Sequence, residues 1–138
     1  MTIVISEDEI IYFDAVVQRL DLAIKPVRRE IIYRDGTAPR PNDCHANVAR
    51  WAAENPNVVP AYGWLVESDD GWFRQLVAHS LLAHADGRYI DITPMDPHER
   101  RFVVHIGPQE GFFGLLPRFS ALTWPVPQLA GGVTQVQP

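Results

Sequence analysis

The chain has 138 residues, of which 46% are hydrophobic, and a formal net charge of −5. That length predicts a single domain with a buried core, and the acidic balance argues against non-specific nucleic-acid binding and against anionic membrane surfaces. The single cysteine excludes an internal disulfide framework, and no apolar run approaches the length of a membrane-spanning helix.

The N-terminal segment, residues 1–8, has no basic residue ahead of its apolar residues and soon becomes acidic. It therefore lacks the pattern of a signal peptide. We expect a soluble, cytoplasmic protein.

The first predicted element is a helix that begins at a capping box formed by Ser6 and Glu9. Apolar residues then recur at helical spacing: Ile10, Phe13, Val17, Leu20 and Ile24. Pro26 ends this helix. A β-branched pair predicts a short strand over residues 29–33, and a Gly- and Pro-rich loop is predicted over residues 34–42.

The second predicted helix follows this loop and has Asn42 or Asp43 as its N-cap. It carries Cys44 in its first turn and ends at the sequence Asn55-Pro56-Asn57. The side chains expected on its buried face are Cys44, Val48, Trp51 and Ala52. His45 would point about 100° away from Cys44 around the helix axis, so we expect it to face solvent.

Extended segments separated by turn sequences follow the second helix. Four strands are predicted: Val58–Glu67, Trp72–Ala83, Tyr89–Thr93 and Arg101–Ile106. Beyond residue 107 the chain is rich in Gly, Pro and aromatic residues, which predicts irregular structure around the core. We expect one α+β domain over residues 1–129, with the Cys44 helix packed on an antiparallel β-sheet, and a flexible tail over residues 130–138.

The turn between the second and third predicted strands decides whether His79 and Asp91 can meet. A two-residue loop would place them on opposite faces of the sheet. A three-residue loop over residues 85–87 pairs His79 with Thr93, so that His79 and Asp91 share a face as diagonal neighbours. Gly87 suits the left-handed residue that closes this type of loop. The sequence therefore permits a His79–Asp91 pair.

Cys44, His79 and Asp91 are the candidate catalytic residues. A cysteine attacks as the thiolate, and a helix N-terminus together with a nearby imidazole lowers the pKa of the thiol. An acid can then fix the tautomer and orientation of that imidazole. A thiol at a helix start, followed by His and Asp on successive strands, is a suitable order for this chemistry.

These residues resemble the papain-like cysteine hydrolase superfamily, and especially its transglutaminase-like branch. The matching segments cover roughly residues 42–94 and are Cys44 ahead of Asn47–Trp51, Val59–Trp64, Ala78–Ser80 and Asp86–Pro94. The resemblance implies a minimal version of the papain-like fold, with Cys44 as nucleophile, His79 as base and then acid, and Asp91 as the orienting group. We expect no cofactor and no metal.

Two features depart from that family. The connection between the helix and His79 is short, which leaves little room for specificity subdomains. No glutamine lies just upstream of Cys44 to supply the oxyanion donor that papain uses, so Asn42 or the backbone N–H of Cys44 would serve. The expected substrate is a peptide, a protein or a small molecule with an amide, isopeptide or ester carbonyl, and either hydrolysis or acyl transfer fits.

Each candidate residue also has a structural interpretation. Cys44 could pack as a small apolar residue, His79 could bond a backbone carbonyl in the core, and Asp91 could cap the hairpin. Tyr62 and Trp64 are candidates for the wall of a substrate groove, although core packing is the simpler interpretation. The other tryptophans are expected in the core or in the walls of a cleft.

Three functions remain open from the sequence: a thiol hydrolase or acyl-transfer enzyme, a catalytically silent domain of the same fold, and a zinc-binding protein. The silent domain would bind a protein partner through the aromatic and Pro-rich C-terminal third. A zinc site would combine Cys44 with several histidines, but the paired short spacings of structural zinc sites are absent. Three separated residues that agree in type, order and permitted register favour the enzyme.

Overall fold

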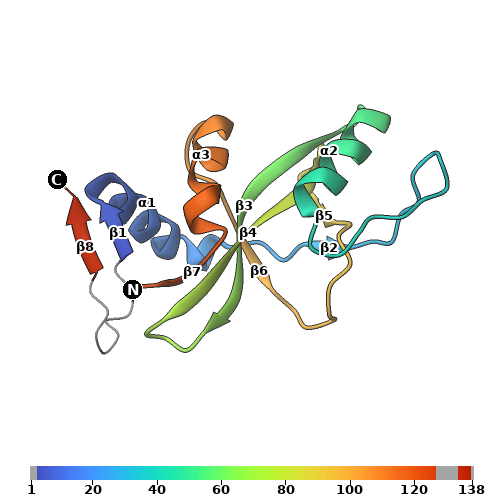
Figure 1. The fold of residues 1–138 in the computed structure, drawn as a ribbon. Helices are drawn as coiled ribbons and strands as arrows, with labels where there is room; N and C mark the ends of the chain where they lie inside the picture. Colours follow the sequence, from blue (N-terminus) through green and yellow to red (C-terminus); the bar gives the residue numbers. More distant parts are fainter. Residues whose placement is uncertain (1–2, 127–133, 138) are drawn as a thin grey trace.

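The structure is a computed structural model that describes residues 3–126 and 134–137. In this part of the chain the α-helices are α1 (Glu7–Gln18), α2 (Cys44–Glu54) and α3 (Gln109–Phe119), and a 3₁₀ turn, η1 (Leu20–Leu22), follows α1. The strands are β1 (Ile3–Ser6), β2 (Val27–Arg28), β3 (Val58–Asp69), β4 (Arg74–His84), β5 (Tyr89–Asp91), β6 (Arg101–Val104), β7 (Ala121–Trp124) and β8 (Thr134–Gln137). Figure 1 shows their arrangement.

A mixed six-stranded sheet forms the centre of the molecule, in the order β2-β5-β4-β3-β6 with β7 beside β4. β3, β4, β5 and β6 correspond to the four strands predicted from the sequence, and each pair among them is antiparallel. The α+β class is confirmed. The prediction of a purely antiparallel sheet is wrong at one edge, because β2 runs parallel to β5 with Val27 opposite Ile90. β1 and β8 form a separate parallel pair.

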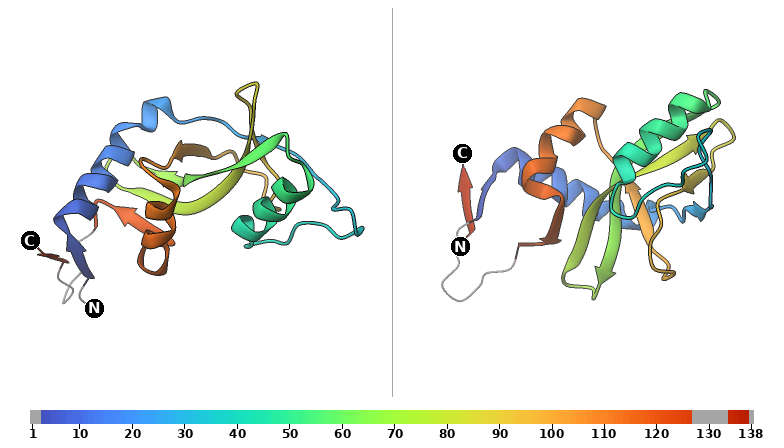
Figure 2. Two further views of the ribbon diagram at one scale, coloured as in Figure 1. Left: turned by 90° about the horizontal axis from the view of Figure 1, so that it is seen from above. Right: turned by 45° about the vertical axis from the view of Figure 1, so that its right-hand side comes forward.

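The helices pack on the sheet through two clusters of buried side chains. α1 and α3 share the larger cluster, whose aromatic members are Phe13, Trp64, Phe112, Phe119 and Trp124. α2 packs through the second cluster, which comprises Val48, Val58, Leu82, Ile90 and Ile92. As a result α2 and α3 are spaced along the long β3–β4 hairpin (Figure 2).

On one side of β4 the pairing with neighbouring strands has a gap, and the start of α2 lies at this gap. β3 pairs with β4 along its whole length on one side. On the other side β7 pairs with residues 74–77 and β5 pairs with residues 82–83. Among the strands that the structure describes, none occupies this side of β4 at His79 and Ser80. The first turn of α2 lies here, since His45 forms a hydrogen bond to Ser80.

The N-terminal third agrees with the sequence at its start and differs further on. The predicted capping box is present, with Ser6 Oγ accepting from the Glu9 N–H at 3.1 Å and Glu9 Oε1 accepting from the Ser6 N–H at 2.9 Å. The helix ends earlier than predicted, because Ile24 leaves the helical path to exchange two backbone hydrogen bonds with Phe102. The strand predicted over residues 29–33 is wrong, since the observed strand is β2.

The C-terminal third is more regular than predicted. α3 and β7 form where we expected irregular structure, because burial of Phe112 and Phe119 in the larger cluster stabilises the helix. Within the expected tail, β8 pairs with β1, while residues 130–133 and 138 lie outside the described residues. No helix among the residues described is both long and apolar enough to cross a membrane.

Candidate active site

Cys44 is the first residue of α2 and is half-buried. Asp43 occupies the N-cap position, but its side chain makes no capping hydrogen bond to the helix. The first backbone N–H groups of α2 therefore lack a side-chain cap from Asp43, and they give this end of the helix a partial positive charge. That charge favours the thiolate form of Cys44 over the thiol.

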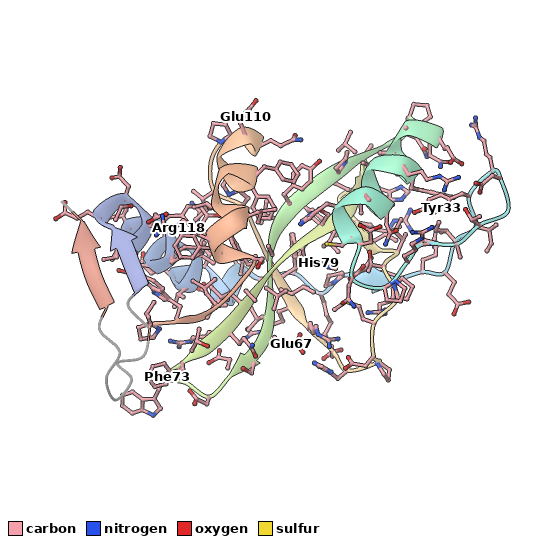
Figure 3. The ribbon with its side chains drawn as sticks, viewed as in Figure 1. Tyr33, Glu67, Phe73, His79, Glu110 and Arg118 are labelled. Carbon is pink, nitrogen blue, oxygen red and sulfur yellow. The ribbon has the colours of Figure 1, made fainter. Side chains whose placement is uncertain are left out.

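His79 on β4 and Asp91 on β5 form a buried pair. The loop between these strands spans residues 85–87: the His84 N–H donates to Arg88 O at 2.9 Å, and Gly87 has a φ of 91°. Of the two loops considered, the structure has the three-residue loop, with the register that lets His79 and Asp91 share a face. His79 Nε2 lies 2.8 Å from Asp91 Oδ2, and both residues are only 4% exposed. Figure 3 labels His79 on β4 near the start of α2.

The hydrogen bond to Asp91 decides which ring nitrogen of His79 is available to interact with the Cys44 sulfur. Because Nε2 is bonded to the carboxylate, Nδ1 is the ring nitrogen left for the sulfur. Burial lowers the pKa of His79, but hydrogen bonds with Asp91 and Cys44 outweigh it and raise the pKa to about 9. His79 is therefore an imidazolium at neutral pH.

The pKa of the Cys44 thiol is shifted in the opposite direction, to a lower value. Burial raises the pKa of the thiol, but hydrogen bonds with His45 and His79, together with the charges of the two imidazoles, outweigh it and bring the pKa to about 6. At neutral pH the site thus holds a thiolate beside an imidazolium. A thiolate is the form of cysteine that attacks carbonyl carbons.

Asn47, three residues after Cys44, ties α2 to the strand that carries Asp91. Its Nδ2 donates to Thr93 Oγ1 at 3.1 Å and to Arg40 O at 2.8 Å, and its Oδ1 accepts from the Arg40 N–H at 3.1 Å. The Thr93 N–H in turn donates to Asp91 Oδ1 at 3.1 Å. Asn47 therefore fixes the distance between the helix start and the acid. Asn47 was not among the residues expected from the sequence, although it is a polar residue close to the expected buried face of the helix.

The prediction that His45 faces solvent is wrong. Its Nδ1 forms a hydrogen bond with Ser80 Oγ, and its ring lies 5.6 Å from the ring of Phe113 and 6.5 Å from that of Tyr62. The prediction is wrong because α2 begins at the open edge of β4. At this edge a side chain that points about 100° away from Cys44 around the helix axis still packs against other side chains, as His45 does against Phe113 and Tyr62.

The other candidates have different surroundings. Trp64 is fully buried and its Nε1–H donates to Tyr12 Oη at 2.8 Å, so it belongs to the core and not to a groove. Tyr62 is half-buried and its hydroxyl accepts from Gln109 Nε2 at 3.2 Å. Asn42 is exposed and has a φ of 58°. Trp72 is 79% exposed, against the expectation that every tryptophan lies in the core or in a cleft wall.

The remaining histidines lie in other settings. His98 is next to Asp96 and Glu67, at 3.0 Å and 3.4 Å. His105 lies between Tyr12 Oη at 2.6 Å and Pro108 O at 2.9 Å. Over residues 3–126 and 134–137, no group of three or more His, Cys, Asp and Glu side chains is arranged to hold a metal ion. The zinc interpretation thus has no candidate set of ligands in that part of the chain.

Comparison of the chain with models of protein families, with curated proteins and with solved structures finds no match. What the site can do follows from its own geometry. A thiol at a helix start lies beside an imidazole that is bonded to a carboxylate, and acyl transfer can use such groups as nucleophile, proton carrier and orienting group.

Proposed function

We propose that this protein is a small cysteine hydrolase or acyl-transfer enzyme. Cys44 is the nucleophile, His79 is the proton carrier and Asp91 orients His79. The observation that carries the proposal is the buried His79, which is bonded to Asp91 through Nε2 and interacts with the Cys44 sulfur. A core histidine that merely satisfies its polar atoms needs no thiol at a helix start beside it.

In the first step the Cys44 thiolate attacks the carbonyl carbon of an amide or ester. A C–S bond forms, and the carbonyl π pair moves to the oxygen. The backbone N–H of Cys44 at the start of α2 is one candidate donor to this oxyanion, and the exposed Asn42 side chain is another.

In the second step the tetrahedral intermediate collapses. The carbonyl bond re-forms and the bond to the leaving amine or alcohol breaks, while His79 donates its Nδ1 proton to that group. The acyl group is then on sulfur. Neutral His79 next removes a proton from water, for hydrolysis, or from an amine, for transfer, as the water oxygen or amine nitrogen bonds to the thioester carbon and the carbonyl π pair moves to oxygen. When this second tetrahedral intermediate collapses, the carbonyl bond re-forms and the C–S bond breaks, which releases the acid or amide and the thiolate. Asp91 stabilises the imidazolium in both halves of the cycle.

The arrangement also supports a minimal papain-like core of the transglutaminase-like kind. A helix that starts with Cys44 precedes antiparallel strands that carry His79 and Asp91, in the order that the resemblance implies. The substrate is proposed as a peptide, a protein or a small molecule with an amide, isopeptide or ester carbonyl. The aromatic residues of the C-terminal third are largely buried, which leaves less surface for the alternative of a silent binding domain; Phe112, Phe119 and Trp124 are examples.

Turnover of an ester, a peptide amide and an isopeptide by the full chain tests the proposal. Cys44→Ser is expected to abolish release of the leaving group with little change in stability, because an alcohol is not ionised at neutral pH. His79→Ala should do the same, and Asp91→Asn should reduce turnover by a smaller factor. His84→Phe, which changes another imidazole on β4, is the control and should leave turnover unchanged. Absence of thiol-dependent turnover on all three classes would favour the silent binding domain.

A further inference from the structure

Cys44 has a second imidazole beside it, and the mechanism above does not use it. His45 follows Cys44 in the first turn of α2, and its imidazole is near enough to the sulfur to lower the pKa of the Cys44 thiol. Ser80, its partner on the sheet, is fully buried and follows His79 on β4. Consecutive residues of the helix thus meet consecutive residues of the strand. Ser80 anchors His45 and Asp91 anchors His79, so each imidazole beside Cys44 has its own partner.

The His45 ring is held in place by aromatic side chains of β3 and α3. Its centroid lies 6.0 Å from Phe112 and 5.6 Å from Phe113, both edge to face, and 6.5 Å from Tyr62. Phe112 is fully buried, so this wall belongs to the core of the protein. A ring bonded on one edge and packed on its faces has little freedom to turn away from the sulfur.

The bond to Ser80 also sets the chemistry of the free nitrogen. Because Nδ1 is bonded to Ser80 Oγ, Nε2 is the nitrogen left for the sulfur. When the Ser80 hydroxyl donates to Nδ1, the proton of neutral His45 resides on Nε2. Nε2 also carries a proton when the ring is charged, so His45 can donate a hydrogen bond from Nε2 in either form. His79 has a different role, since it donates its Nδ1 proton to the leaving amine or alcohol.

We propose that His45 is a catalytic hydrogen-bond donor at Cys44, and that Ser80 is a positioning residue that fixes its tautomer. The His45 Nε2–H first donates to the thiolate. As the C–S bond forms and the carbonyl π pair moves to oxygen, the same N–H donates to the oxyanion, and it keeps its proton throughout. His45 thereby supplies the side-chain donor that the sequence lacks upstream of Cys44. This inference rests on the proposed function.

Two reactions of the same sulfur separate this role from a structural one. Alkylation by iodoacetamide displaces iodide and forms no oxyanion, whereas acylation by p-nitrophenyl acetate passes through one. Both rates are measured against pH in the wild type and in His45→Phe, whose ring fits the aromatic wall. The double variant His45→Phe/Ser80→Ala removes the hydroxyl that the single variant leaves unpaired, and His45→Gln restores an N–H donor. His84→Phe is the matched control.

The pH at which the alkylation rate reaches half of its maximum is the alkylation midpoint. In His45→Phe and in the double variant it should rise by about 1 pH unit, because the charged Cys44 thiolate loses the His45 N–H as a hydrogen-bond donor. Above the midpoint, alkylation should change by less than about threefold while acylation falls about 100-fold, the typical loss on removing one oxyanion donor. His45→Gln should recover part of the acylation rate, and His84→Phe should match the wild type.

An unchanged midpoint, or equal losses in both reactions, would overturn the role of His45. The proposed function fails differently, through a wild-type thiol that is not acylated at any pH. The oxyanion part of the inference then fails with it, and the alkylation midpoints of wild type and His45→Phe still decide whether His45 donates to the thiolate.

Discussion

At the scale of single residues, Asn47 is the side chain that holds the candidate site in register. It joins the loop before α2, through Arg40, to Thr93 beyond β5. Asn47→Ala removes these bonds and leaves the buried Thr93 hydroxyl and the backbone of Arg40 without this partner, so it should lower the free energy of unfolding by about 3 kcal/mol. Urea denaturation measures this. Asn57→Ala, at an exposed position, is the control and should change it by less than about 0.5 kcal/mol.

The pKa values of Cys44 and His79 predict a bell-shaped pH profile for kcat/KM. The rate should rise as the thiolate forms near pH 6 and fall as the imidazolium loses its proton near pH 9. Asp91→Asn removes a group that raises the pKa of His79, so the alkaline limb should move to lower pH. An alkaline limb that stays in place in Asp91→Asn would contradict the assigned pairing of His79 with Asp91.

The sequence was sufficient to identify His79 and Asp91 as residues that can pair, but not the residues that support the candidate site. Gly87 made the three-residue loop, and with it the His79–Asp91 register, possible from the sequence, because glycine suits the left-handed residue that closes such a loop. His45 and Asn47 were missed because their roles depend on where α2 meets the sheet. An amphipathic pattern identifies the buried face of a helix, but it does not show that the helix starts at an open strand edge.

At the scale of elements, the pairing of β3 with β6 requires a glycine. A Cβ on Gly63 would lie 2.1 Å from Val103 O and 2.8 Å from Phe102 Cζ. Gly63→Ala must therefore separate the strands or displace Phe102, and should destabilise the protein by about 3 kcal/mol or more. Gly114→Ala in α3 is the control: its Cβ would meet nothing within 4 Å, and alanine should stabilise the helix by about 0.5–1 kcal/mol. Thermal unfolding followed by circular dichroism gives both values.

Element prediction succeeded for β3, β4, β5 and β6 and failed for α3. Long runs with β-branched residues and turn sequences at their ends marked β3 and β4 clearly. α3 contains Gly111, Gly114 and Pro117, which weaken any local helical signal. Its stability comes from tertiary burial of Phe112 and Phe119, and a single sequence does not display that. Similarly, the parallel pairing of β2 depends on where the chain lies after η1.

At the scale of the whole molecule, a chain of hydrogen bonds links α1, β3 and the segment between β6 and α3. The Trp64 Nε1–H donates to Tyr12 Oη, which lies 2.6 Å from His105 Nδ1. Pro108 O can only accept, so His105 Nε2 carries the proton and Nδ1 accepts from Tyr12. The folded protein therefore holds His105 in its neutral form, and burial lowers the pKa of this imidazole.

A group whose folded pKa is lowered stabilises the fold above its unfolded pKa, and this contribution is lost as the pH falls. The free energy of unfolding should accordingly fall between pH 7 and pH 5, and part of that fall should disappear in His105→Gln. Urea titrations at the two pH values measure it, with His98→Gln as a control at a half-exposed position. If the free energy of unfolding depends on pH equally in the wild type and in His105→Gln, protonation of His105 is not coupled to this chain of hydrogen bonds.

The rate at which iodoacetamide alkylates Cys44 in the native protein, followed from pH 4 to pH 10, shows whether the surroundings of Cys44 activate it as a nucleophile. The midpoint of this pH profile should lie near pH 6, since both imidazoles stabilise the thiolate. A midpoint near the ordinary cysteine value of about 8.5 would contradict it. So would a thiol that stays inert up to pH 8 in the native protein and reacts only after unfolding.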